Sequence, residues 1–277
     1  MNLNSVNTNL AAMTALQSLN LTNDALGVVQ KRISTGFRVA DAKDDGGAFA
    51  VAQTVRGDVA GLTAANEQLG GLKGVVDVTL HGLNQVSKTM VELRTVLTRL
   101  ADGTINTEQR NQYNQQYEQL RSQAQRFIED ATYNGRTLLN TSAASGGDDI
   151  STIRNEVGSV LTIAAFDGAT DFVVAAAPAD DTDARTAITG DWSTVNEAIN
   201  DALNRLGADA RYIDSQINYN RDKLDAVEGG LGALIDADIA KEAARLQALQ
   251  IRQQLGTQTL SITNQAPQAL LSLFGGR

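Results

Sequence analysis

An apolar side chain recurs at every seventh position from Val55 to Leu97, and this ladder limits the fold more than any other feature of the sequence. A heptad repeat of this length is typical of a long helix whose narrow apolar stripe must be covered by other helices. We therefore expect one helix from Ala48 to Leu100. The ladder consists of Val55, Leu62, Leu69, Val76, Leu83, Met90 and Leu97.

Two later segments alternate spacings of three and four residues in the same way and can supply the partner helices. Asn106 and Gln109 predict a capping box at the start of the first segment. We expect that helix to end at Asn134-Gly135, and its short connection to the long helix predicts an antiparallel bundle. The other segment has one polar position, Asn220, which we expect to fix the register. The seam positions are Tyr113, Tyr117, Leu120 and Phe127, then Leu206, Ile213, Ile217, Asn220, Leu224 and Val227.

Both ends of the chain predict amphipathic helices, one over residues 1–35 and one that begins at Asp236 or Asp238. The polar face of the first carries amides and hydroxyls with few charges, which suits a crowded helical assembly better than free solution. An ordinary surface helix of a globular domain is the alternative. The apolar positions are Leu3, Val6, Leu10, Met13, Leu19, Leu26, Val29 and Ile33, and near the C-terminus Leu246, Leu249, Ile251, Leu255, Leu260, Leu270, Leu271, Leu273 and Phe274.

The heptads disappear between residues 141 and 190, where Gly, Ser, Ala, Asp and Thr dominate. The runs Ser159–Ile163 and Phe172–Val174, with Asp167-Gly168 between them, predict a small β-hairpin. The expected fold is mainly α, an elongated rod of long helices with paired terminal helices. Its expected regions are residues 1–44 with 236–277, residues 45–140 with 191–235, and the surface insertion 141–190.

Several classes of function find no support in the sequence. There is no cysteine and only one histidine, His81, and the P-loop, GxSxG and HExxH motifs are missing. We therefore expect neither an enzyme nor a site for a metal or cofactor. No apolar run reaches the roughly 18 residues of a membrane-spanning helix, and no basic patch alternates with aromatic residues to hold nucleic acid. The N-terminus also lacks the pattern of a cleaved leader.

Four runs of the sequence, in this order, resemble motifs of bacterial flagellin: residues 33–45, 131–139, 250–260 and 264–274. The short insertion resembles that of a small flagellin without large outer domains, and the absence of cysteine suggests the alphaproteobacterial branch. The resemblance implies a filament subunit for swimming motility, whose terminal helices are disordered in the monomer and pair in the filament. A hook–filament junction protein and, from another class, a soluble helical adaptor rod are the alternatives, and the apolar termini and C-terminal motifs disfavour them.

The resemblance also implies partners and a location. The subunit would be exported unfolded by the flagellar type III apparatus, with an export chaperone at its C-terminal region, into the extracellular filament. There it would bind copies of itself and meet the hook-associated junction and cap proteins. Many flagellins present an arginine-rich patch to a Toll-like receptor. Glu92 stands where those relatives have an arginine and Gln116 where they have a glutamate, so we do not expect that receptor to respond.

Glycines interrupt the long helix, and each costs roughly 1 kcal/mol relative to alanine. Such glycines permit close approach of another backbone, so we expect the glycine-bearing faces to contact other subunits. On this hypothesis, alanine at Gly70, Gly71 or Gly74 stabilises the monomer and impairs assembly. The glycines are Gly57, Gly61, Gly70, Gly71, Gly74 and Gly82.

Overall fold

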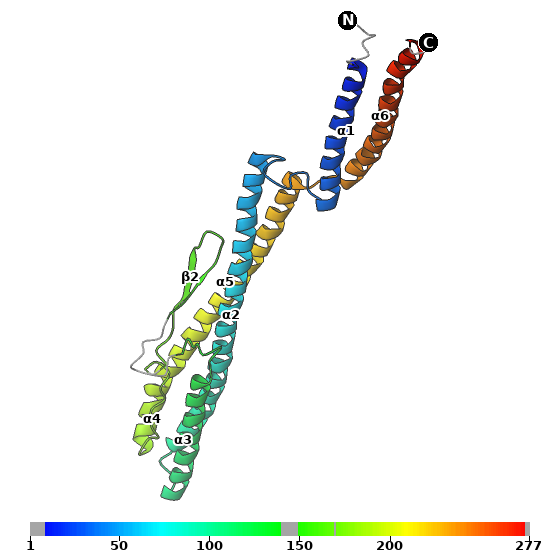
Figure 1. The fold of residues 1–277 in the computed structure, drawn as a ribbon. Coiled ribbons are helices and arrows are strands. Elements are labelled where there is room, and N and C mark those ends of the chain that lie inside the picture. The colour runs from blue at the N-terminus through cyan, green and yellow to red at the C-terminus, as the bar shows by residue number, and fades with distance from the viewer. Residues whose placement is uncertain (1–8, 140–148, 169, 275–277) are drawn as a thin grey trace. The chain divides into compact units, whose positions relative to one another are not determined.

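The computed structural model describes residues 9–139, 149–168 and 170–274, with side chains as far as residue 265. The fold is mainly helical with one two-stranded sheet, as predicted (Figure 1). Its elements are α1 (Leu10–Thr35), α2 (Gly46–Leu100), α3 (Thr107–Glu129), β1 (Ile150–Ile153), β2 (Val160–Ile163), α4 (Asp181–Thr189), α5 (Asp191–Ile235) and α6 (Ile239–Phe274).

The chain divides into two compact units. The terminal unit comprises Met1–Arg56 and Val227–Arg277, and the central unit comprises Gly57–Ala226. The terminal unit contains α1 and α6 with the first turns of α2 and the last turns of α5. The central unit contains the rest of α2 and α5 with α3, α4 and the sheet.

A single apolar core fills the central unit, and α2 is its spine. Every ladder residue from Leu62 to Leu97 is buried, while Val55, in the terminal unit, is half-buried. α3 and α5 complete this core. The predicted seam positions Tyr117, Leu206, Ile213 and Ile217 are buried, and Tyr113, Leu120, Phe127, Leu224 and Val227 are half-buried.

Asn220, the polar position of the α5 seam, is fully buried and fully engaged. Its amide nitrogen donates to the Asn66 Oδ1 at 3.0 Å and to the Arg154 carbonyl at 2.9 Å. Its Oδ1 accepts a hydrogen bond from Gln216. A buried amide with all these partners disfavours other registers of α5, because a shift of the helix would leave buried polar groups without hydrogen bonds.

The end of α3 differs from the prediction. The capping box at Asn106 and Gln109 is present, but the helix ends at Glu129, before Asn134-Gly135. Those two residues instead have positive φ angles of 50° and 74° and form a tight turn closed by Tyr133 and Arg136. Asn-Gly suits such a two-residue turn as well as a helix end, and here the turn prevails.

The predicted hairpin was right in one strand, since Ser159–Ile163 contains β2, but wrong in the other. β2 pairs in antiparallel fashion with β1, with Ile150 opposite Ile163, and not with Phe172–Val174. The 172–174 segment packs against α3, where the Val174 carbonyl accepts from Arg121 at 2.8 Å and Phe172 is buried. The insertion also contains α4, which the composition did not reveal and which Asp180 caps through the amides of Thr182 and Asp183.

Candidate functional site: the paired terminal helices

α1 and α6 lie side by side and antiparallel in the terminal unit (Figure 1). Their shared apolar seam is short. Leu26 and Val29 of α1 are buried against Leu249 of α6, at 9%, 1% and 6% exposure. Ala25, Ile33 and Leu246 flank this cluster. Farther along, Gly256 lies so close to Leu19 that a Cβ there would stand 3.2 Å from the leucine methyl.

Polar contacts join the two helices along the seam. Arg32 Nη1 lies 3.2 Å from Glu242 Oε1, and Gln253 donates to the Asn23 Oδ1 at 2.8 Å. Near the start of α1, Asn9 donates to the Thr263 carbonyl at 2.9 Å. Contacts therefore run from Asn9 to Arg32 on one helix and from Thr263 to Glu242 on the other.

Most of the large apolar side chains on this pair are not covered. Predicted assembly positions with more than half of their surface exposed are Leu10 (67%), Met13 (64%), Ile251 (58%) and Leu255 (57%). Leu19 and Leu260 are half-buried. Sequence patterning missed four further exposed apolar residues, because they lie outside the stripe: Leu16, Leu21, Val28 and Ile262. Apolar residues on more than one side of a helix indicate that more than one neighbour covers it.

Some predicted positions fall outside this description. Leu3 and Val6 precede the described residues, and the side chains of Leu270, Leu271, Leu273 and Phe274 are not described. α6 itself continues to Phe274, and Asp238 caps it by accepting from the Lys241 amide at 3.0 Å.

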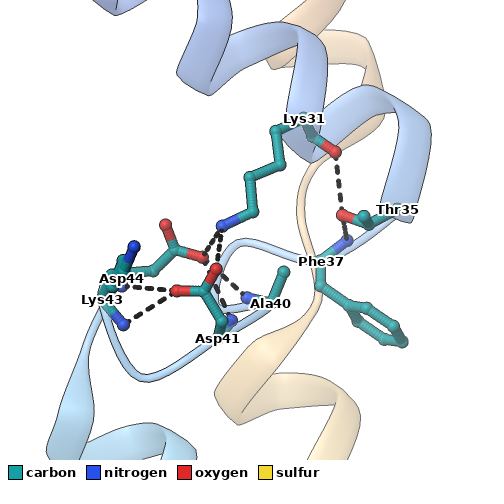
Figure 2. A network of polar contacts seen from close by, with 7 residues as sticks. All are labelled: Lys31, Thr35, Phe37, Ala40, Asp41, Lys43 and Asp44. Atoms are coloured by element: carbon teal, nitrogen blue, oxygen red, sulfur yellow. Dashed lines mark hydrogen bonds and ion pairs between the residues drawn. The ribbon is translucent and has the colours of Figure 1, made fainter.

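The connector between α1 and α2 is held by an ion-pair network (Figure 2). Lys31 Nζ lies 2.7 Å from Asp41 Oδ2 and 2.8 Å from Asp44 Oδ2. The same carboxylates accept backbone hydrogen bonds, Asp44 from Ala40 and Asp41 from Lys43. The hydrogen bonds that Lys31 donates to Asp41 and Asp44 lower the pKa of both carboxyl groups. The same two bonds raise the pKa of the Lys31 ammonium group.

The connector also packs onto the chain segment between α5 and α6. Arg38 N donates to the Ile235 carbonyl at 2.7 Å, and Ala237 N donates to the Gly36 carbonyl at 2.9 Å. Gly36 has a φ of 77°, which glycine adopts without strain. Below these bonds, Val39, Ala52 and Ile235 form a small buried cluster.

Other chemistry has few candidates here. Among the described residues, no group of three or more His, Asp or Glu side chains could hold a metal ion, and no helix is long and apolar enough to cross a membrane. His81 is exposed on α2. The geometry of this site is that of a helical pair with exposed apolar faces, which is typical of an association surface.

Comparison with known proteins agrees with this geometry. The model of the bacterial flagellin N-terminal helical region matches residues 6–144, and that of the C-terminal helical region matches residues 193–274. Flagellin FljK of Caulobacter vibrioides is 33% identical over 286 residues, which cover 99% of this chain and 100% of that protein. The chain belongs to the bacterial flagellin family. It is a structural subunit of the flagellar filament and associates with copies of itself.

Two more similarities place this flagellin among its relatives. A flagellin of Brucella melitensis biotype 1 is 32% identical, over 98% of this chain and 99% of that protein. The crystal structure of Bacillus cereus flagellin matches this structure over 56% of this chain and 88% of the Bacillus chain, with a TM-score of 0.51 and 22% sequence identity. This similarity supports the fold. The resemblance to a short flagellin with alphaproteobacterial relatives is thereby confirmed.

The glycines of α2 fall into two groups, which corrects the expectation that all face other subunits. A Cβ at Gly74 would stand 2.9 Å from the Tyr133 ring, and one at Gly82 would stand 2.8 Å from the Ala131 methyl. A Cβ at Gly61 would stand 3.2 Å from the Cβ of Glu156. At these three glycines, the space that a side chain would occupy is taken by other residues of the same chain. A Cβ would meet no described atom within 4 Å at Gly57, Gly70 and Gly71.

Glu92 and Gln116, the positions that bear on receptor recognition, both carry exposed side chains. Absence of the Toll-like receptor response stays a prediction. A strong response of a receptor-expressing reporter cell to purified flagellin would contradict it.

Proposed function

We propose that the exposed apolar faces of α1 and α6 are the surfaces through which this flagellin joins the filament. The observation that carries the proposal is the imbalance within the pair. Leu26, Val29 and Leu249 are buried, whereas Leu10 and Met13 are about two-thirds exposed. Burial of a large apolar side chain is worth about 1.5–3 kcal/mol, so copies of the chain that cover these faces gain a substantial driving force.

The charge distribution supports the same surface. Between Leu10 and Gln30 the only charged residue is Asp24, and between Leu246 and Phe274 it is Arg252. Surfaces that remain in water are usually charged, and depletion of charge is typical of interface cores. A subunit that offers one face to a different face of the next copy builds an open helical polymer.

The proposal extends to the division of labour along the chain. Residues 1–44 with 236–277 form the assembly region, residues 45–140 with 191–235 form the helical body, and residues 141–190 form a surface insertion. An export chaperone first binds the C-terminal region of the chain. The chain then leaves the cell unfolded through the flagellar type III apparatus. The assembled filament contacts the junction and cap proteins at its ends. The role is structural and not enzymatic.

A truncation tests this proposal. Removal of Leu246–Arg277 deletes most of α6 and leaves α1 without its partner, while the central unit keeps all of its core residues. We expect a soluble, helical chain that does not extend filament seeds. Circular dichroism measures the helices, and sedimentation with electron microscopy measures extension. Normal filaments from the truncated chain would refute the proposed surface.

A further inference from the structure

Met13 lies within the exposed apolar face at the start of α1. Its side chain is 64% exposed, and Leu10 and Leu16, three residues before and after it, are 67% and 47% exposed. Residues three apart on a helix are neighbours on its surface, so these three side chains form one apolar strip. The Met13 thioether is therefore open to small solutes in the soluble subunit.

The other methionine that the structure describes has the opposite environment. Met90 belongs to the ladder of α2 and is fully buried in the core of the central unit. The chain contains three methionines and no cysteine, and the third methionine, Met1, precedes the described residues. Oxidation of such side chains follows their exposure. Of the two described sulfur atoms, a solute can thus reach the one on the assembly surface but not the one in the core.

Hydroperoxides convert an exposed methionine into its sulfoxide by transfer of one oxygen atom. With hydrogen peroxide, a lone pair of the sulfur attacks one peroxide oxygen, and the S–O bond forms as the O–O bond breaks. The proton of the transferred hydroxyl group passes to the departing hydroxide, which leaves as water. Sulfur is oxidised by two electrons and the peroxide is reduced by two. The product is a polar side chain with a strong hydrogen-bond acceptor.

A sulfoxide at Met13 opposes assembly in two ways. It removes apolar surface from the strip, and it places a polar oxygen where the next copy of the chain would bury it. A polar group that is buried without a hydrogen bond is costly. Leu10 and Leu16 offer it no donor, and the nearby Thr14 hydroxyl already donates to the Leu10 carbonyl.

We propose that Met13 is an oxidation-sensitive site that controls the incorporation of this flagellin. A peroxide that reaches the soluble subunit oxidises Met13 and blocks addition of that subunit to the filament. In subunits that are already assembled, Met13 is covered and protected, so the oxidant stops growth and leaves the existing filament intact. The effect on addition and the protection in the filament both rest on the function proposed above.

Peptide mapping by mass spectrometry tests the selectivity of the oxidation. Soluble subunits and assembled filaments receive the same dilute hydrogen peroxide, which catalase then removes. We expect Met13 to be oxidised at least about tenfold faster in the soluble subunit than in the filament, and Met90 to react slowly in both. Comparable rates for Met13 in the two states, or for Met13 and Met90 in the soluble subunit, would overturn the proposal.

Extension of unoxidised seeds tests the effect on assembly. Oxidised subunits should extend seeds at least about tenfold more slowly than untreated ones at unchanged helix content, which corresponds to about 1.4 kcal/mol. M13L is the matched control, because leucine keeps the apolar volume and Met1 and Met90 remain. It should extend seeds at the untreated rate before and after peroxide. M13Q places a polar amide at the same position and should be slow without peroxide.

Equal inhibition of M13L and the parent by peroxide, or normal extension by M13Q, would overturn the role of Met13. The truncation of Leu246–Arg277 separates this failure from a failure of the proposed function. If oxidised subunits extend seeds normally and the truncated chain does not, the assembly surface is supported and the role of Met13 is overturned. Normal extension by the truncated chain would refute the assembly surface itself, and with it the role of Met13.

Discussion

The terminal and central units are built from similarly patterned helices, but they bury their apolar side chains to different extents. In the central unit, α2 is covered by α3 and α5, and the ladder from Leu62 to Leu97 is buried. In the terminal unit, α1 has α6 as its partner, and it buries Leu26 and Val29 while Leu10 and Met13 remain exposed. Two helices share one line of contact, so a pair of broadly apolar helices leaves surface that only further chains can cover. We therefore expect the central unit to fold on its own contacts and the terminal unit to depend on neighbouring copies of the chain.

The sharpest contrast is between a leucine in each unit. Leu97 is fully buried in the central core, and L97A should lower the free energy of unfolding by about 2–5 kcal/mol through lost burial and a cavity. Leu21 is 64% exposed on α1, and L21A should change the stability of the soluble subunit by less than about 0.5 kcal/mol while slowing seed extension. Urea unfolding followed by circular dichroism measures the first effect. Equal losses of stability for the two variants would contradict the comparison.

The glycines of α2 provide a second, smaller contrast. G82A should destabilise the soluble subunit by about 1–3 kcal/mol, because the new methyl would overlap Ala131 at 2.8 Å. G70A meets open space and should stabilise it by up to about 1 kcal/mol, since alanine favours the helix. Thermal unfolding of both variants measures the difference. If G70A also impairs seed extension, the open glycines face another copy, and if it does not, that part of the glycine hypothesis fails.

The connector network should give the smallest effect, visible mainly as a pH dependence in the terminal unit. The pKa of Asp41 and of Asp44 is lowered by the hydrogen bond from Lys31, so their contribution to folding is present above the ordinary value of 3.8 and is lost as the pH falls through the lowered values. The pKa of Lys31 is raised, so its contribution is present up to 10.5 and is lost only at higher pH.

Amide NMR shifts can follow this titration at Ala40 and Lys43, whose N–H groups donate to the two carboxylates. Both amides should report midpoints below pH 3.8, and K31M should raise these midpoints. Midpoints that stay the same in K31M would show that the lysine does not hold the connector.

Periodicity predicted most of the helical architecture, because heptad spacing indicates which face of a helix is apolar and packs against other helices. It identified the spine of the central unit and the helices α1 and α6, and the cap at Asn106 followed from local chemistry. It failed where tertiary contacts decide. Phe172 and Val174 have strand-like character, yet they pack against α3 and leave Ile150–Ile153 to pair with β2.

The candidate site was predicted less completely than the fold. Apolar stripes were visible in the sequence. The exposure of Leu16, Leu21 and Ile262, however, follows from the small part of its surface that each helix of the pair buries against the other. The same holds for the glycines, since no sequence pattern distinguishes Gly82, which admits Ala131, from Gly70, which faces open space. Pairing of Arg32 with Glu242 joins residues 210 positions apart, and only the fold brings them together.

The most direct test of the account is amide hydrogen exchange of α1 and α6 in the soluble subunit and in the assembled filament. If copies of the chain cover these helices, the amides of both should be protected by about 100-fold or more on assembly, because opening them then requires removal of neighbours. The amides around Leu83, Met90 and Leu97 in the central core should change far less, since their surroundings are already buried. Equal protection of α1 and α6 in the soluble subunit and in the filament would contradict the claim that their exposed faces form the assembly surface.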